Sequence, residues 1–125
     1  MKKILILGAS SDIGTNVTEL FLKKKWQVTA HYNKSNKKLI DLKSKYKNID
    51  LIKFDLRNIF KFEKYLKKNK NLFKNYDAFV SLTGYLKPTS FEKFKAVDVI
   101  EHFNVNYLTN LLIIREIVKG MEKRK

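Results

Sequence analysis

The sequence predicts an α/β protein built on a doubly wound parallel sheet. Three observations lead to this prediction. Strand-like and helix-like segments alternate four times along the 125 residues. The first segment, residues 4–7, is the unbroken apolar run expected of a strand buried on both faces. Polar clusters follow the strands, and alternation of this kind implies right-handed crossovers with helices on both faces of the sheet.

The first strand leads directly into a turn with two glycines and then into a helix. Residues 8–14 read G-A-S-S-D-I-G, and apolar residues at three- and four-residue steps predict a helix over residues 12–24. Glycines let the backbone approach a ligand closely, and the helix directs free N–H groups and the positive end of its dipole to the same place. We therefore expect an anion site, for which a dinucleotide pyrophosphate is the simplest ligand.

The other elements follow from the same two patterns. Alternating apolar and polar residues predict a second strand over residues 26–32, and helical spacing predicts a short amphipathic helix, capped by Ser35 or Asn36, that ends near residue 47. The remaining predictions are a third strand over 49–54, a helix over 58–68, a fourth strand over 76–82, a loop over 85–93 and one long helix from 94 or 98 to 121.

These elements form a single predicted domain, residues 1–125, with a Rossmann-like sheet of four parallel strands joined by crossover helices. In such sheets ligands bind beyond the carboxyl ends of the strands. The polar clusters fall at these ends, at residues 8–14, 31–35, 55 and 83–84. Their coincidence at one edge is stronger evidence for a site than any single motif.

Composition excludes several kinds of function. The chain has no cysteine and two separated histidines, so we expect neither disulfides nor a metal site. The net charge is +15, but only three of the 27 basic residues are arginine and the lysines are spread over every predicted helix. We therefore predict a solvated lysine surface and no nucleic-acid partner. No apolar run approaches the length of a membrane span, so we expect a cytoplasmic protein without membrane contact.

Residues 8–14 resemble the T-G-A-S-S-G-I-G turn of short-chain dehydrogenase/reductases, and the resemblance extends over the whole chain. Asp55-Leu56 resembles the pair that contacts adenine in that family, and residues 82–84 stand where the family has Asn-Ala-Gly. The resemblance implies hydride transfer between a nicotinamide cofactor and a small carbonyl or alcohol substrate. The cofactor-binding residues that it implies are Gly8, Ser10, Ser11, Asp12, Ile13, Gly14, Asp55, Leu56, Leu82, Thr83 and Gly84.

One catalytic residue is implied by the same resemblance. Val105-Asn106 resembles the helix position at which the family has an asparagine that helps to hold a proton-relay water. Asn106 is therefore the expected catalytic residue, and Asn104 is the second choice. An alternative is that Asn106 only hydrogen-bonds a neighbouring strand.

Asp12 departs from the family pattern, because it replaces the middle glycine of the turn. Aspartate is a good N-cap and favours the positive end of a helix, so Asp12 is interpreted as the cap of the first helix. The alternative is that it repels the pyrophosphate, in which case Asp12→Gly would tighten cofactor binding. The spacing of Gly8, Ser11 and Gly14 also fits the turn of extended sugar-nucleotide epimerases and dehydratases. The A-S-S-x-I-G sequence pattern, however, favours the classical group of short-chain dehydrogenase/reductases.

The end of the second strand bears on the choice of cofactor. NAD-selective folds place an acidic residue there for the ribose 2′-hydroxyl, and this chain has Tyr32 instead. Tyr32, Asn33, Lys34 and Ser35 offer hydroxyls, an amide and an ammonium, which suit a 2′-phosphate. We predict that NADP(H) is preferred over NAD(H). The alternative is that Lys34 is one more surface lysine.

Other polar residues have simpler interpretations. His31 alternates outward from the second strand and His102 lies on a helix, so we expect both to be surface or packing residues. Asp55 either contacts adenine or caps the third helix.

The family's catalytic signature is not found in these residues. No tyrosine is followed four residues later by a lysine, and the sequence ends where the family places its catalytic serine. We interpret the chain as the N-terminal, cofactor-binding half of an oxidoreductase that forms homo-oligomers at full length. We expect the 125 residues alone to lack turnover. The alternatives are a sugar-nucleotide epimerase or dehydratase, a non-catalytic nucleotide-binding module and a basic nucleic-acid binder.

Overall fold

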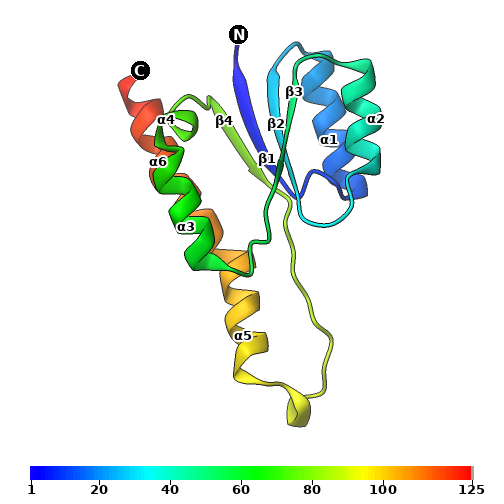
Figure 1. Ribbon diagram of the computed structural model, residues 1–125, viewed down its shortest axis with the longest axis vertical. Helices are drawn as coiled ribbons and strands as arrows, with labels where there is room; N and C mark the ends of the chain where they lie inside the picture. Colours follow the sequence, from blue (N-terminus) through cyan, green and yellow to red (C-terminus); the bar gives the residue numbers. More distant parts are fainter. Residues whose placement is uncertain (125) are drawn as a thin grey trace.

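Four parallel strands form a sheet in the order β3-β2-β1-β4 (Figure 1). The computed structural model describes residues 1–124. The predicted fold class is confirmed, and the strand boundaries differ from the predicted ones by at most two residues. The strands are β1 Lys3–Leu7, β2 Gln27–Tyr32, β3 Ile49–Lys53 and β4 Ala78–Ser81.

β1 is flanked by a strand on each side, which explains its unbroken apolar sequence. Ile4 pairs with Val28 of β2 and with Ala78 of β4. The four residues from Ile4 to Leu7 are at most 1% exposed, because helices cover both faces of the sheet. β3 and β4 form the two edges of this sheet within residues 1–124.

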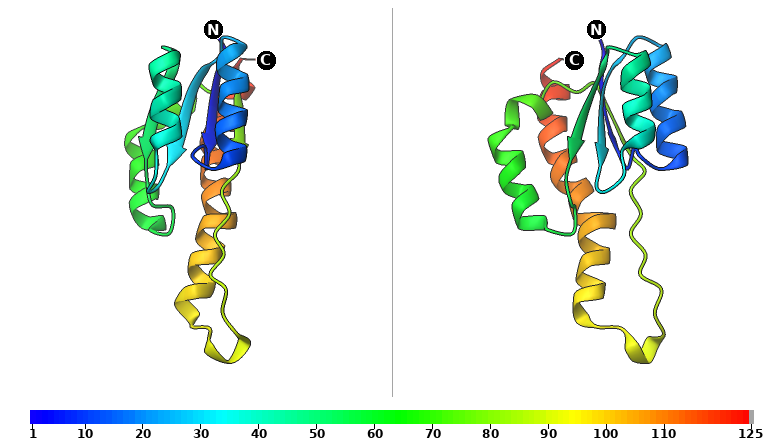
Figure 2. Two further views of the ribbon diagram at one scale, coloured as in Figure 1. Left: turned by 90° about the vertical axis from the view of Figure 1, so that its right-hand side faces the viewer. Right: turned by 45° about the vertical axis from the view of Figure 1, so that its right-hand side comes forward.

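Helices cover the two faces separately (Figures 1 and 2). Their apolar stripes pack on alternate residues of β1, with Ile4 and Ile6 facing one helix layer and Leu5 and Leu7 facing the other. The first layer consists of α1 Asp12–Lys23 and α2 Lys37–Lys45; the second consists of α3 Ile59–Lys68, α4 Lys70–Phe73 and α6 Thr109–Lys123.

The predicted long helix is interrupted. α5, Ala96–Phe103, passes into a π-helical segment, Asn104–Leu108, before α6 begins. The hydroxyl of Thr109 donates to the carbonyl of Asn104, five residues earlier, at 2.8 Å. This wider turn shifts the helical register by one residue and buries both Asn104 and Val105. Single π-helical turns of this kind occur frequently at functional sites.

α5 and the loop before it extend away from the sheet (Figure 2). The loop contains a short 3₁₀ turn, Phe91–Lys93, inside the region predicted to be irregular. Of the helices in residues 1–124, none is both long and apolar enough to cross a membrane.

Candidate functional site

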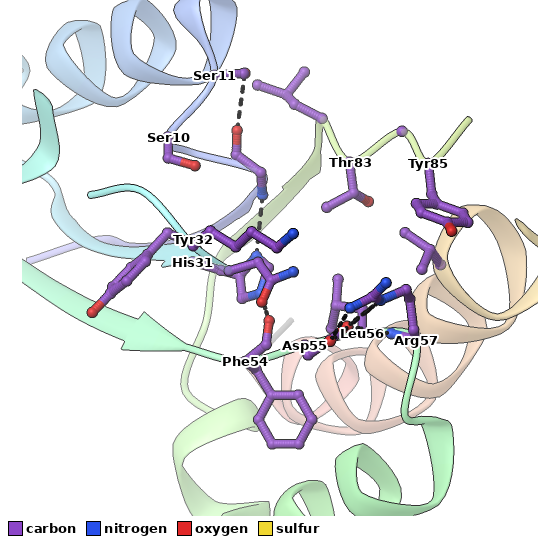
Figure 3. A pocket seen from close by; sticks show the side chains of 16 residues that line it. Ser10, Ser11, His31, Tyr32, Phe54, Asp55, Leu56, Arg57, Thr83 and Tyr85 are labelled. Atoms are coloured by element: carbon purple, nitrogen blue, oxygen red, sulfur yellow. Dashed lines mark hydrogen bonds and ion pairs between the residues drawn. The ribbon is translucent and has the colours of Figure 1, made fainter. Parts of the chain in front are cut away.

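A cavity of about 390 Å³ opens at the carboxyl ends of the four strands (Figure 3). This is the edge at which the sequence predicts a ligand site. Segments that follow all four strands contribute to its wall, together with Val105 from the π-helical segment. The predicted cofactor residues that line it are Gly8, Ser10, Ser11, Tyr32, Asn33, Lys34, Asp55, Leu56, Leu82, Thr83 and Gly84; Asp12, Ile13, Gly14, Ser35 and Asn106 do not line it.

The turn after β1 depends on glycine at its first position. Gly8 has a φ of +69°, and a Cβ there would lie 2.8 Å from the backbone carbon of Leu82. A side chain is therefore excluded by both the backbone conformation and the contact with the segment after β4. The result is a close approach of two strand ends along one wall of the cavity.

Ser11, not Asp12, caps the first helix, so the predicted cap is wrong by one residue. The Ser11 hydroxyl accepts a hydrogen bond from the Gly14 N–H at 3.0 Å and donates to the Gly8 carbonyl at 3.0 Å. Ser11 is extended, as a cap requires, whereas Asp12 is already the first helical residue. Serine and aspartate cap equally well, so the position at which the turn ends decides between them.

Asp12 does not line the cavity. Its side chain is 86% exposed and forms an ion pair with Lys38 of α2. The hydrogen bond from Lys38 lowers the pKa of Asp12, which keeps the carboxylate charged and neutralised by its partner. This arrangement argues against repulsion of a pyrophosphate in the turn.

We expect Asp12→Gly to leave NADPH affinity within about threefold of the wild type, because an exposed ion pair contributes little. Titration of NADPH into both proteins at one salt concentration measures this. Binding that tightens more than about tenfold would show that the carboxylate does repel the phosphates.

Asp55 is held by Arg57 and does not cap α3. The Arg57 guanidinium donates to the two carboxylate oxygens through Nε at 3.1 Å and Nη2 at 2.8 Å, and the Arg57 backbone N–H donates at 3.0 Å. The cap of α3 is Asn58, whose side chain accepts from the Lys61 N–H at 3.2 Å. The pKa of Asp55 is lowered chiefly by the hydrogen bond from Arg57, with a smaller effect from the nearby charge of Lys34.

Asn106 holds the backbone after β4. Its side chain accepts from the Tyr85 N–H at 2.8 Å and donates to the Tyr85 carbonyl at 2.9 Å. Asn104 is buried and donates to the Arg57 carbonyl at 3.3 Å. Both asparagines therefore fix the backbone of segments that line the cavity, and the role of Asn106 in holding a water stays a prediction.

His31 is buried, so of its two predicted roles, surface or packing residue, the structure excludes the surface role. Only 3% of the residue is exposed, because β2 lies between two other strands and is covered on both faces. The ring lines the cavity between the Gly8 N–H and the Phe54 carbonyl. Burial lowers the pKa of His31, and this outweighs the opposite effect of the hydrogen bond to Phe54.

A family model for short chain dehydrogenases matches residues 2–125. The chain belongs to the short-chain dehydrogenase family. The resemblance seen in the glycine-containing turn is thereby confirmed. No curated protein sequence matches the chain.

Solved structures show the same fold for this short-chain dehydrogenase chain. A 4-hydroxyisoleucine dehydrogenase complexed with NADH is 24% identical with a TM-score of 0.84, and the match covers 99% of this chain and 51% of the dehydrogenase chain. ElxO with NADP bound is 26% identical with a TM-score of 0.75, and the match covers 98% of this chain and 51% of the ElxO chain. An NADPH-bound carbonyl reductase from chicken fatty liver is 17% identical with a TM-score of 0.79, and the match covers 98% of this chain and 49% of the reductase chain. The chain spans about half the length of these structures.

Five residues that line the cavity are not among the predicted site residues. Arg57 was detectable, because an arginine two residues after an aspartate at a strand end can reach back to it. Tyr85 follows the Leu-Thr-Gly segment directly, and its ring lies 5.9 Å from the Arg57 guanidinium. The full set is His31, Phe54, Arg57, Tyr85 and Val105.

Proposed function

We propose that this chain binds NADP(H) in the cavity and forms the cofactor-binding domain of an NADP-dependent oxidoreductase. The observation that carries the proposal is the convergence of all four strand ends on one cavity, with the Gly8 turn and the start of α1 on one side and Asp55 on the other. A dinucleotide needs both an anion site and a flat apolar site within one groove. The full protein would act on a small carbonyl or alcohol substrate.

The residues present fit the two ends of such a cofactor. The turn has no room for a side chain at Gly8, so its backbone lines the cavity there, and the turn leads directly into the N-terminus of α1, whose dipole favours an anion such as a pyrophosphate. Leu56 and the buried Val105 supply apolar surface for adenine. When bound, the nicotinamide ring would supply or accept the hydride.

The second strand end supports a preference for NADP(H). Tyr32, Asn33 and Lys34 line the cavity there, and no acidic residue stands at that position. An ammonium group binds a 2′-phosphate by a charge-assisted hydrogen bond, whereas a carboxylate would repel it.

Asn106 would assist the reaction indirectly, through the Tyr85 backbone that it holds beside the cavity.

Calorimetric titration of the chain with NADPH and then with NADH tests this function. We expect NADPH to bind at least about tenfold more tightly, because one charge-assisted contact to phosphate exceeds 1.4 kcal/mol. Tighter binding of NADH would overturn the NADP preference but keep the nicotinamide site. Failure of both cofactors to bind would overturn the proposed function.

A further inference from the structure

The imidazole of His31 lies where the ends of β1, β2 and β3 meet, at the base of the cavity (Figure 3). Its Nδ1 is 3.3 Å from the Gly8 backbone nitrogen, and its Nε2 is 2.8 Å from the Phe54 carbonyl oxygen. One ring thus joins the first residue of the turn to the last residue before Asp55.

The two backbone partners define the protonation state of the ring. A backbone N–H can only donate, so Nδ1 must accept from Gly8 and carry no proton. A carbonyl can only accept, so Nε2 must carry the proton that it donates to Phe54. The bridge therefore requires neutral His31 in its Nε2–H form.

The bridge continues into the first helix. The Gly8 carbonyl accepts from the Ser11 hydroxyl at 3.0 Å and from the Ser11 N–H at 3.3 Å, and that hydroxyl accepts from the Gly14 N–H at 3.0 Å. A continuous series of contacts thus runs from the end of β3, through His31, to the first turn of α1 (Figure 3).

Burial of the ring also favours its neutral form, because it lowers the pKa of His31. Lys34, Asp55 and Arg57 line the cavity with it, and Asp55 is held by Arg57. Among the described residues, the wall segments that follow β1 and β4 contribute no charged side chain. Tyr32 at the end of β2 and Tyr85 after β4 are the other titratable groups of the wall. Lys34 is thus the cation without a carboxylate partner in the described part of this wall.

We propose that His31 is a positioning residue of the cofactor site, which holds the phosphate-binding turn at a fixed distance from the adenine-binding segment. This inference rests on the proposed function. The turn that it fixes through Gly8 would bind the pyrophosphate, and Phe54 directly precedes Asp55 at the adenine end. A ligand that contacts both ends benefits from this preorganisation, whereas a ligand that contacts one end does not.

His31→Leu is the direct test, because leucine fills the site but makes neither hydrogen bond. We expect the Kd of NADPH, which contacts both ends, to rise at least about tenfold, while the Kd of adenosine 2′-monophosphate stays within about twofold. His102→Gln is the matched control, since this second histidine lies outside the cavity. It is expected to bind both ligands as the wild type does.

Several outcomes would overturn the proposal. One is that His31→Leu binds NADPH with unchanged affinity. Another is that the variant loses affinity equally for both ligands, because a purely structural role of His31 would give an equal loss. If His31→Leu does not fold, His31→Asn replaces it, since the asparagine oxygen can still accept from Gly8 while the contact to Phe54 is lost. In that variant we expect a smaller loss that is again confined to NADPH, and an equal loss for both ligands would count against the proposal.

The nitrogen NMR spectrum of the wild-type imidazole shows independently which ring nitrogen carries the proton. We expect the Nε2–H form. An Nδ1–H form would contradict the bridge. If the wild type binds neither ligand, the proposed function fails and His31 loses its role with it. If the wild type binds NADPH and His31→Leu binds it equally, only the inference about His31 fails.

Discussion

Replacing Gly14 by alanine is expected to remove NADPH binding and to lower the free energy of unfolding by about 1–3 kcal/mol, the usual cost of overpacking. A Cβ at Gly14 would lie 2.2 Å from the Gly8 carbonyl oxygen and 2.7 Å from the Ala9 Cα. These are backbone atoms of the turn, so the clash can be relieved only by moving the turn or α1. Urea unfolding and NADPH titration of the same preparation measure both effects.

Gly84→Ala is the matched control for this prediction. Gly84 also lines the cavity, but a Cβ there meets no atom within 4 Å, so its unfolding free energy should change by less than about 0.5 kcal/mol. Alanine in a helix otherwise stabilises by about 1 kcal/mol relative to glycine. A gain in stability for Gly14→Ala would therefore contradict the close contact between α1 and the turn.

Lys34→Ala is expected to weaken NADPH binding by about 10- to 100-fold and to leave NADH binding unchanged. The estimate corresponds to one charge-assisted hydrogen bond to the 2′-phosphate, about 1.5–3 kcal/mol. Lys34 lines the cavity, whereas the other cation in its wall, Arg57, is engaged by Asp55. The ratio of the two dissociation constants is the quantity to measure.

Lys37→Ala controls for the loss of one positive charge nearby, since Lys37 begins α2 and lies outside the cavity. We expect it to lower both affinities slightly and equally. If Lys34→Ala also weakens NADPH and NADH to the same degree, Lys34 acts through general attraction of anions and does not select the 2′-phosphate.

The predictable part of the fold came from patterns that act over short distances. The apolar run ending at Leu7 and the alternation of strands with helices specify a parallel sheet, and a parallel sheet brings all strand ends to one edge. The position of Asp55 beside Tyr32 and Thr83 at one cavity follows from that topology alone. For this reason most of the predicted cofactor residues lie together in the structure.

The unpredicted features depend on contacts that no local pattern contains. The π-helical turn at residues 104–108 adds one residue to a helix whose apolar spacing reads as continuous. Alternation in β2 directs His31 away from the first helix layer and leaves open whether it is a surface or a packing residue; the residue is buried because β2 is covered on both faces. Ser11 and Asp12 are equivalent caps by residue type, and only the hydrogen bonds of the folded turn distinguish them.

We propose that the edge formed by the four strand ends binds the cofactor. Backbone amide NMR shifts recorded during titration of the chain with NADPH would test this proposal. We expect the largest shifts on residues 8–14, 32–34, 55–57 and 82–85, with little change on the exposed face of α2. Shifts spread over the lysine-rich helices, or none at saturating NADPH, would contradict it.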